Sequence, residues 1–310
     1  MIRLVVTELT RLRWRRAVLL LLALGIAAGA AIFVGVVVET RPRTIEDIAA
    51  QNGPQVLDDV QRCIERPRQF GLPPDADQAA CEEQILGFYG ANQLNLREQR
   101  ESGTGPALVA ILTLVLLLAG TTFVGHDWNS GSMSNQLLFE PRRLRVWAAK
   151  AVAVVLVSGV LAFAVLVAYW SGLWALASAR DVPIAEHAVE AAYKQAALGT
   201  VMVAGAGLFG YALTMALRTT VGSLGLLLAT AFGGIVVVWT GFGDAERLMP
   251  WGNFVAYVVG GYTYYGPCDS FDCASTAHTI DRSDGAVYFL VVLLAVAVSS
   301  LVAFRRRDVP

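Results

Sequence analysis

Long apolar stretches alternate with polar ones along the whole chain. Six predominantly apolar stretches are long enough to cross a membrane as helices, which requires about 20 residues. They are residues 17–38, 106–124, 146–176, 196–217, 221–240 and 286–304. Two large polar segments, 39–104 and 241–285, lie between them. The pattern predicts an all-α polytopic membrane protein with six transmembrane helices and a single transmembrane domain over 1–310.

The sixteen residues before the first span carry five arginines. Apolar residues recur among them at helical spacing, at Ile2, Val5, Leu9 and Leu12. This spacing predicts an amphipathic N-terminal interfacial helix on the inner membrane surface. A simple charged flank for the first span is the alternative. Residues 17–38 are too long for a signal-peptide core, so we expect an uncleaved span.

The first polar segment, 39–104, contains two amphipathic runs, one after Pro54 and one after Pro73 and Pro74. We expect an external helical hairpin. The second polar segment, 241–285, contains an apolar and aromatic run over residues 254–265. That run is too short to cross, so it predicts a short re-entrant helix before the last span.

Four cysteines lie in these two segments, at Cys63, Cys81, Cys268 and Cys273. Four cysteines allow three pairings. Proximity in the sequence favours Cys63–Cys81 and Cys268–Cys273, and free thiols are the alternative. We expect at least one disulfide, because both segments are assigned to the oxidising side of the membrane.

The sidedness follows from the basic residues. Of the 24 lysines and arginines, 13 fall in the short segments 1–16, 125–150, 218–220 and 305–310. The positive-inside rule therefore places these segments, and both termini, in the cytoplasm. The predicted location is the cytoplasmic (inner) membrane of a bacterium.

Motifs for catalysis are missing from the chain. It has no G-x-x-x-x-G-K-[ST] and no H-E-x-x-H, and its three histidines lie in three separate segments. We expect no enzyme activity, no metal site and no cofactor. A net charge of −1 suggests no nucleic-acid partner. With 125–150 counted as cytoplasmic, the spans hold no ionisable residue, which argues against an ion-driven secondary transporter.

Residues 125–150 form a short amphipathic loop between the second and third spans, with Ser130-Gly131-Ser132, a leucine pair and then Pro141, Arg145 and Lys150. This loop, the coupling elbow (125–145), resembles the first cytoplasmic loop of ABC-2 type permeases, the membrane subunits of bacterial ABC exporters. The resemblance is specific over 127–150 and extends in architecture to the whole chain. It implies six spans, cytoplasmic termini, a second permease copy (a homodimer) and membrane lipid around them.

The resemblance also implies two copies of a separate ABC ATPase subunit, which would hold ATP and Mg and dock on the elbow. The expected contact residues combine apolar anchors, turn residues and rim charges. They are Asp127, Trp128, Ser130, Gly131, Ser132, Met133, Leu137, Leu138, Phe139, Pro141, Arg142 and Arg143. The alternative for this stretch is an ordinary positive-inside loop resting on lipid.

The spans offer mainly Thr, Ser and Gly as polar groups. A pathway of that kind predicts export of an apolar or amphipathic cargo, such as a lipid, a drug or a modified peptide. Thr113, Thr121 and Thr122 are the expected pathway-lining residues. The competing function is a non-transporting membrane anchor or sensor whose external cysteine-containing hairpin binds a partner.

Overall fold

The structure is a computed structural model that describes residues 1–89, 94–239, 247–265 and 277–306. In this part of the chain five helices are long and apolar enough to cross a membrane. They begin with α2 (Arg16–Glu39), and continue with α7 (Thr104–Asn129, preceded by α6, Leu96–Glu101), α9 (Arg143–Ala179), α10 (Ala188–Leu217) and α13 (Arg282–Arg306). The predicted helical membrane protein is thus confirmed at this level. A sixth apolar helix, α11 (Thr220–Trp239), follows α10 after a tight turn.

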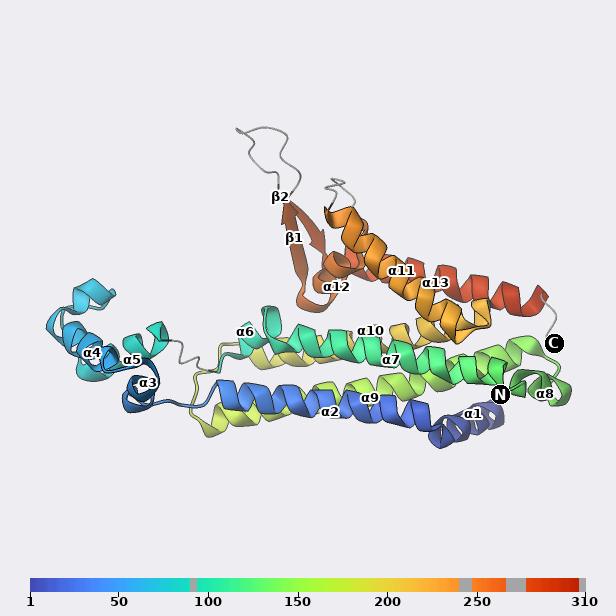
Figure 1. The fold of residues 1–310 in the computed structure, drawn as a ribbon, viewed down its shortest axis with the longest axis horizontal. Helices are drawn as coiled ribbons and strands as arrows, with labels where there is room; N and C mark the ends of the chain where they lie inside the picture. Colours follow the sequence, from blue (N-terminus) through green and yellow to red (C-terminus); the bar gives the residue numbers. More distant parts are fainter. Residues whose placement is uncertain (90–93, 240–246, 266–276, 307–310) are drawn as a thin grey trace.

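The helices α2, α7, α9 and α10 run side by side in an elongated bundle (Figure 1). One end of the bundle, called the N-terminal end below, carries α1 (Ile2–Trp14), α8 (Ser132–Phe139) and the last turn of α13. The opposite end carries α3 (Ile45–Asn52), α4 (Gln55–Glu65) and α5 (Gln78–Phe88), and is called the subdomain end below. The first helix and the last described turn of the chain therefore lie at the same end of the bundle.

Glycines allow the bundle helices to approach closely. A Cβ on Gly120 of α7 would clash with the carbonyl oxygen of Gly207, and one on Gly210 of α10 would clash with that of Leu117. At Gly29 of α2 a Cβ would lie 2.6 Å from Val165 of α9. Small residues serve this purpose in membrane bundles, where backbones pack directly against each other.

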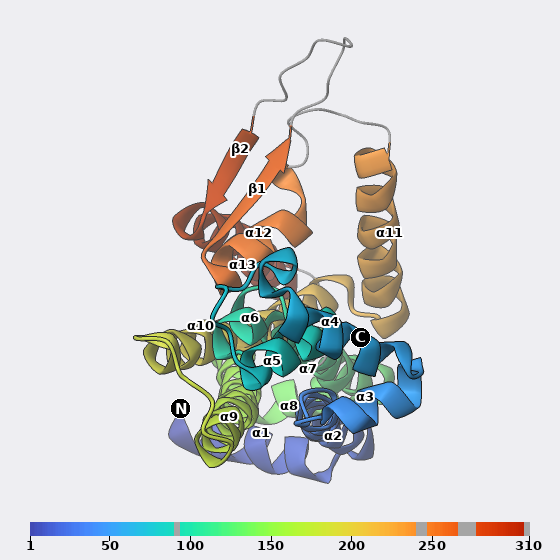
Figure 2. The ribbon, with the colours of Figure 1, turned by 90° about the vertical axis from the view of Figure 1, so that its left-hand side faces the viewer.

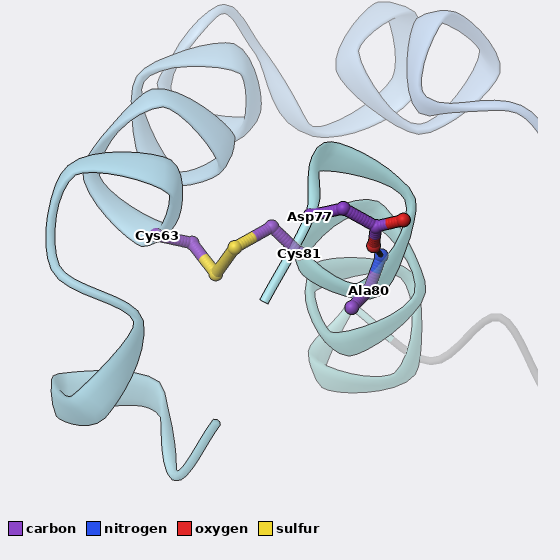
Figure 3. Close-up of a disulfide and its surroundings, with 4 residues drawn as sticks. All are labelled: Cys63, Asp77, Ala80 and Cys81. Atoms are coloured by element: carbon purple, nitrogen blue, oxygen red, sulfur yellow. Dashed lines mark hydrogen bonds between the residues drawn. A yellow bond between two sulfur atoms is a disulfide. The ribbon is translucent and has the colours of Figure 1, made fainter. Parts of the chain in front are cut away.

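The first polar segment folds into a small subdomain with its own apolar core. The core gathers Ile48, Val56 and Ile85 around Cys63 and Cys81, all of them buried. The disulfide Cys63–Cys81 joins α4 to α5 with a Cα–Cα distance of 5.6 Å (Figure 3). The two predicted arms and this pairing are present, while α3 is an additional helix that the sequence reading did not include. Cys268 and Cys273 lie outside the described residues.

Local capping explains where the subdomain helices begin. The Asp77 carboxylate accepts a hydrogen bond from the Ala80 amide at 2.9 Å and starts α5, as Figure 3 shows. Thr44 and Asp47 form a reciprocal capping box at the start of α3. The hydroxyl of Tyr89 donates to Asp59 at 2.7 Å, and this hydrogen bond raises the pKa of Tyr89.

Replacing Cys63 by serine is expected to destabilise this subdomain. Cross-linking a loop of 18 residues stabilises a fold by about 3 kcal/mol in the loop-entropy treatment. Limited proteolysis of membranes with and without reductant measures the effect, with cleavage between residues 54 and 88 as the readout. Equal protease resistance of Cys63→Ser and the native chain would contradict the prediction.

The second polar segment departs from the prediction of a helix over 254–265. The helix α12 spans Pro250–Val259, and the chain then forms β1 (Gly261–Tyr265), which pairs antiparallel with β2 (Ala277–Asp281). Gly260, at φ +129°, ends the helix in a conformation that favours glycine. The alternating Tyr-Thr-Tyr sequence that follows favours a strand. The described residues are therefore mainly helical, consistent with the predicted all-α membrane protein, and one antiparallel pair of strands is added to the helices.

Figure 2 views the bundle from its subdomain end. The hairpin and α12 lie together on one side of the bundle axis, and α11 stands apart from them. A large part of the outer surface of α11 and α13 is apolar and exposed, including Val221, Phe232 and Val291. Such a surface fits contact with lipid or with another membrane helix.

Candidate functional site at the N-terminal end of the bundle

The elbow is a short helix held between two long ones. α7 continues past the predicted span to Asn129, so Asp127 and Trp128 lie on its last turn. Gly131 then takes a left-handed conformation, φ +68°, and α8 begins at Ser132. Pro141 separates α8 from α9, because proline cannot continue the hydrogen-bonded helix. The sequence thus places a turn, the eight-residue helix α8 and a second turn between the end of α7 at Asn129 and the start of α9 at Arg143.

A buried cluster of charges lies beneath α8. The ammonium group of Lys150 on α9 contacts Glu8 Oε2 of α1 at 2.8 Å and Asp127 Oδ2 of α7 at 2.6 Å. All three side chains are fully shielded from solvent. Burying a charge costs several kcal/mol unless it is paired and hydrogen-bonded, so this geometry requires all three partners together.

Neighbouring polar groups complete the cluster. Gln136 of α8 donates from Nε2 to Glu8 Oε1 at 2.6 Å and accepts at Oε1 from Arg11 at 3.0 Å. Arg15 forms a salt bridge with Asp127 and donates to the carbonyl oxygen of Phe123 at 2.7 Å. These contacts join α1, α7, α8 and α9 into one hydrogen-bonded unit, which we call the charge cluster.

The charge cluster also fixes the orientation of the aromatic ring beside it. The guanidinium of Arg15 lies 5.0 Å from the centroid of Phe123, and the ammonium of Lys150 lies 5.3 Å from it. Phe123 is fully buried. Cations at these distances from a ring face are stabilised by its quadrupole, more so where water is excluded.

The outward face of α8 is apolar and exposed. Leu138 and Phe139 are 81% and 91% exposed, although Gln136 on the opposite face of α8 bonds to the charge cluster. Pro141 and Arg142 beside them are also exposed. A leucine and a phenylalanine presented next to cationic residues are typical of a protein contact surface.

The expected contact residues therefore separate into two groups. Leu138, Phe139, Pro141 and Arg142, with Ser130 and Gly131, are exposed and accessible to a partner. Asp127 and Met133 are buried, and Leu137 packs against the core that contains Met133. Ser132 donates to Asp127 at 3.1 Å. In this structure the buried members support the elbow and do not themselves form its outer surface.

Trp128 and Arg143 make contacts within the chain. Trp128 packs edge-on against Phe304 of α13, with ring centroids 6.3 Å apart, and Arg218 lies 4.9 Å above its ring. Arg143 donates to the carbonyl oxygens of Phe304 at 3.0 Å and Arg305 at 3.3 Å. Both residues thereby attach the last turn of α13 to the elbow.

The three predicted pathway threonines lie on α7. Each hydroxyl donates to a backbone carbonyl of its own helix, Thr113 to Val109, Thr121 to Leu118 and Thr122 to Ala119. Thr121 is fully buried against α10 near Gly210. A single copy of the chain therefore brings Thr121 to a helix contact, while Thr113 and Thr122 are partly accessible.

The sequence analysis did not identify five members of the charge cluster as site residues: Glu8, Arg11, Arg15, Gln136 and Lys150. Two signals were available. Glu8 is the single acidic residue of the basic first segment and occurs at helical spacing with Val5 and Leu12. Lys150 is one of only two lysines and lies within the apolar stretch 146–176. Likewise, α1 buries Glu8 and Leu12 against the bundle instead of only lying on a membrane surface.

The fold and the site define a helical protein with several membrane-spanning segments and an anchored elbow. Comparison of the chain with protein-family models, with characterised proteins and with solved structures gave no match.

Proposed function

We propose that the chain is the membrane-spanning permease subunit of an ATP-driven ABC exporter. A separate ATPase subunit docks on the outward face of α8. The observation that supports this is the exposed pair Leu138–Phe139 on a helix anchored by the charge cluster. An anchored apolar surface can receive a partner and pass on its movement, whereas a loop resting on lipid needs no buried charges beneath it.

The charge cluster provides the route for that movement. A push on α8 acts through Gln136 on Glu8, and from there on Lys150 and Asp127. These residues belong to α1, α9 and α7, so three helices respond together. Rigid coupling of this kind converts closure of two ATPase subunits into a change of access in the bundle.

The proposal includes a specific topology. It has six crossings, with α11 as the fifth and α13 as the sixth, and it is supported by the position of α1, α8 and the end of α13 at one end of the bundle. The density of arginines at that end favours the cytoplasm of a bacterium. A second copy of the permease completes the pathway, and ATP and Mg are held by the ATPase subunits. The cargo is apolar or amphipathic.

The docking surface is tested by purifying the chain in mild detergent from its native host and identifying co-purifying proteins. We expect an ATPase subunit with the native chain, and its loss with the double substitution Leu138→Asp, Phe139→Asp. Each buried apolar anchor of an interface contributes about 2 kcal/mol, so two introduced charges lower the affinity by more than a hundredfold.

The matched control is Phe88→Asp, which changes an equally exposed aromatic residue, 79% accessible, on the subdomain at the other end of the bundle. This variant keeps the ATPase if the proposal is right. A competing function is an anchor or sensor whose subdomain binds an external protein, which the disulfide-linked core and the exposed Phe88 favour. In that case Phe88→Asp loses a partner and the α8 variant loses none.

A further inference from the structure

The helix α12 ends in an unusual way at the subdomain end of the bundle. The last three carbonyl groups of a helix that lack backbone donors must find other partners or water. In α12 these are the carbonyls of Tyr257, Val258 and Val259. Each is bonded by a side chain from elsewhere in the chain, and none of these donors belongs to α12 itself.

Three side chains bond these carbonyls: one from α13, which packs against α12, and two from α6 and α10 across the boundary between α12 and the bundle. Arg282, at the start of α13, donates to Tyr257 at 3.3 Å and to Val259 at 3.1 Å. Arg100 of α6 donates to Val259 at 3.3 Å, and Gln195 of α10 donates to Val258 at 3.5 Å. Gln195 also donates to the carbonyl of Arg100 at 2.9 Å, so the two donors support each other.

α12 packs against α13 on one side and contributes to the main apolar core of the bundle on another. α12 lies close against α13, because a Cβ on Gly285 would be only 3.2 Å from the Tyr257 nitrogen. α12, β1, β2 and the start of α13 therefore form one packed unit. The same helix contributes Phe254, Tyr257 and Val258 to the main apolar core, which also contains Leu96 of α6 and Ala192 of α10.

The Gln195 side chain is buried at this boundary. It is 2% exposed, and its Oε1 atom has no hydrogen-bond donor among the residues that the structure describes. An unsatisfied buried oxygen costs free energy, and such a group calls for an explanation. Access of water to this boundary would supply one.

We infer that the boundary between α12 on one side and α6 and α10 on the other is the seam through which the subdomain end opens. Arg100 and Gln195 are the polar ties that hold it closed. When the seam opens, Arg100 and Gln195 exchange the carbonyls of Val258 and Val259 for water, while the apolar face of α12 becomes accessible. The role of the seam rests on the proposed function, because in an exporter this opening would be the exit for the cargo.

Accessibility of a buried position on α12 tests the seam. Val258→Cys is placed in a Cys268→Ser, Cys273→Ser background, and whole cells are treated with a membrane-impermeant maleimide. Val258 is 1% exposed, so labelling is slow while the seam is closed. Adding Arg100→Gln and Gln195→Leu removes both ties, and we expect labelling about tenfold faster.

The matched control is Arg97→Gln, on the same helix as Arg100, because Arg97 bonds to Glu101 and not to α12. It should leave the labelling rate unchanged. An unchanged rate in the double variant, with its thermal stability retained, overturns the inference. If the double variant does not accumulate in the membrane, Gln195→Leu alone carries the test. An about threefold acceleration then supports the seam, and an unchanged rate overturns it.

Labelling requires no ATPase, so it fails or succeeds independently of docking. Faster labelling without any co-purifying ATPase would leave the seam standing and remove the exporter proposal. An ATPase that co-purifies, together with an unchanged labelling rate, would support the exporter proposal and overturn the seam.

Discussion

Replacing Lys150 by methionine is expected to lower the free energy of unfolding by about 3 kcal/mol. The substitution keeps the length of the side chain and removes its charge. Glu8 and Asp127 then each lose a partner while both remain fully shielded from solvent. Removing one member of a buried ion pair is costly because the other charge stays desolvated. For a chain of this size the change corresponds to about 5 °C in apparent Tm.

The sequence provides a matched control. Lys194, the only other lysine, is exposed at the start of α10. Lys194→Met should shift the apparent Tm by no more than about 1 °C, since exposed charges contribute little to stability. Thermal unfolding in detergent, followed by fluorescence-detected size exclusion, measures both variants. Equal shifts for the two lysines would show that the charge cluster does not form.

A double-mutant cycle separates the pair contact from the burial of each group. Glu8→Gln removes one charge and preserves the shape of the side chain. If Lys150 and Glu8 interact directly, the cost of Glu8→Gln is smaller in the Lys150→Met background, by about 1–3 kcal/mol. Additive costs would mean that the two residues contribute separately, and α1 would then be free to move without the elbow.

The sequence predicted those elements that are determined by local pattern. Apolar length identified the five helices that are long enough to cross a membrane, proline positions identified α4 and α5, and the spacing of Cys63 and Cys81 identified their disulfide. Each of these features depends on residues close together in the chain.

Features that depend on distant residues were not predicted. Lys150 and Glu8 are separated by 142 positions, and no local pattern connects them. The helix bounds of α12 were wrong because an apolar, aromatic run suits a helix and a strand equally, and the glycine pair Gly260–Gly261 decided between them. The elbow's buried residues were assigned to its outer surface for a similar reason. Which face of an eight-residue helix is covered depends on α1, which lies more than a hundred residues earlier.

The second large effect is expected at the crossing of α7 and α10. Replacing Gly120 by alanine should lower the free energy of unfolding by about 3 kcal/mol. The added methyl group would overlap the carbonyl oxygen of Gly207 and lie 3.0 Å from the Tyr211 nitrogen. Both neighbours are backbone atoms, so no side chain can rotate to make room. The two helices must separate, and the packing around the buried Thr121 is lost with them.

Gly35→Ala is the control for this substitution. Gly35 lies on α2, and a Cβ there meets nothing within 4 Å. Alanine is the better helix former by about 1 kcal/mol, so this variant should be as stable as the native chain or slightly more stable. The apparent Tm in detergent distinguishes the two, with a fall for Gly120→Ala and no fall for Gly35→Ala. If Gly120→Ala also retains the native Tm, then α7 and α10 do not cross at this glycine. The threonines of α7 would in that case face a space between helices, as a pathway requires.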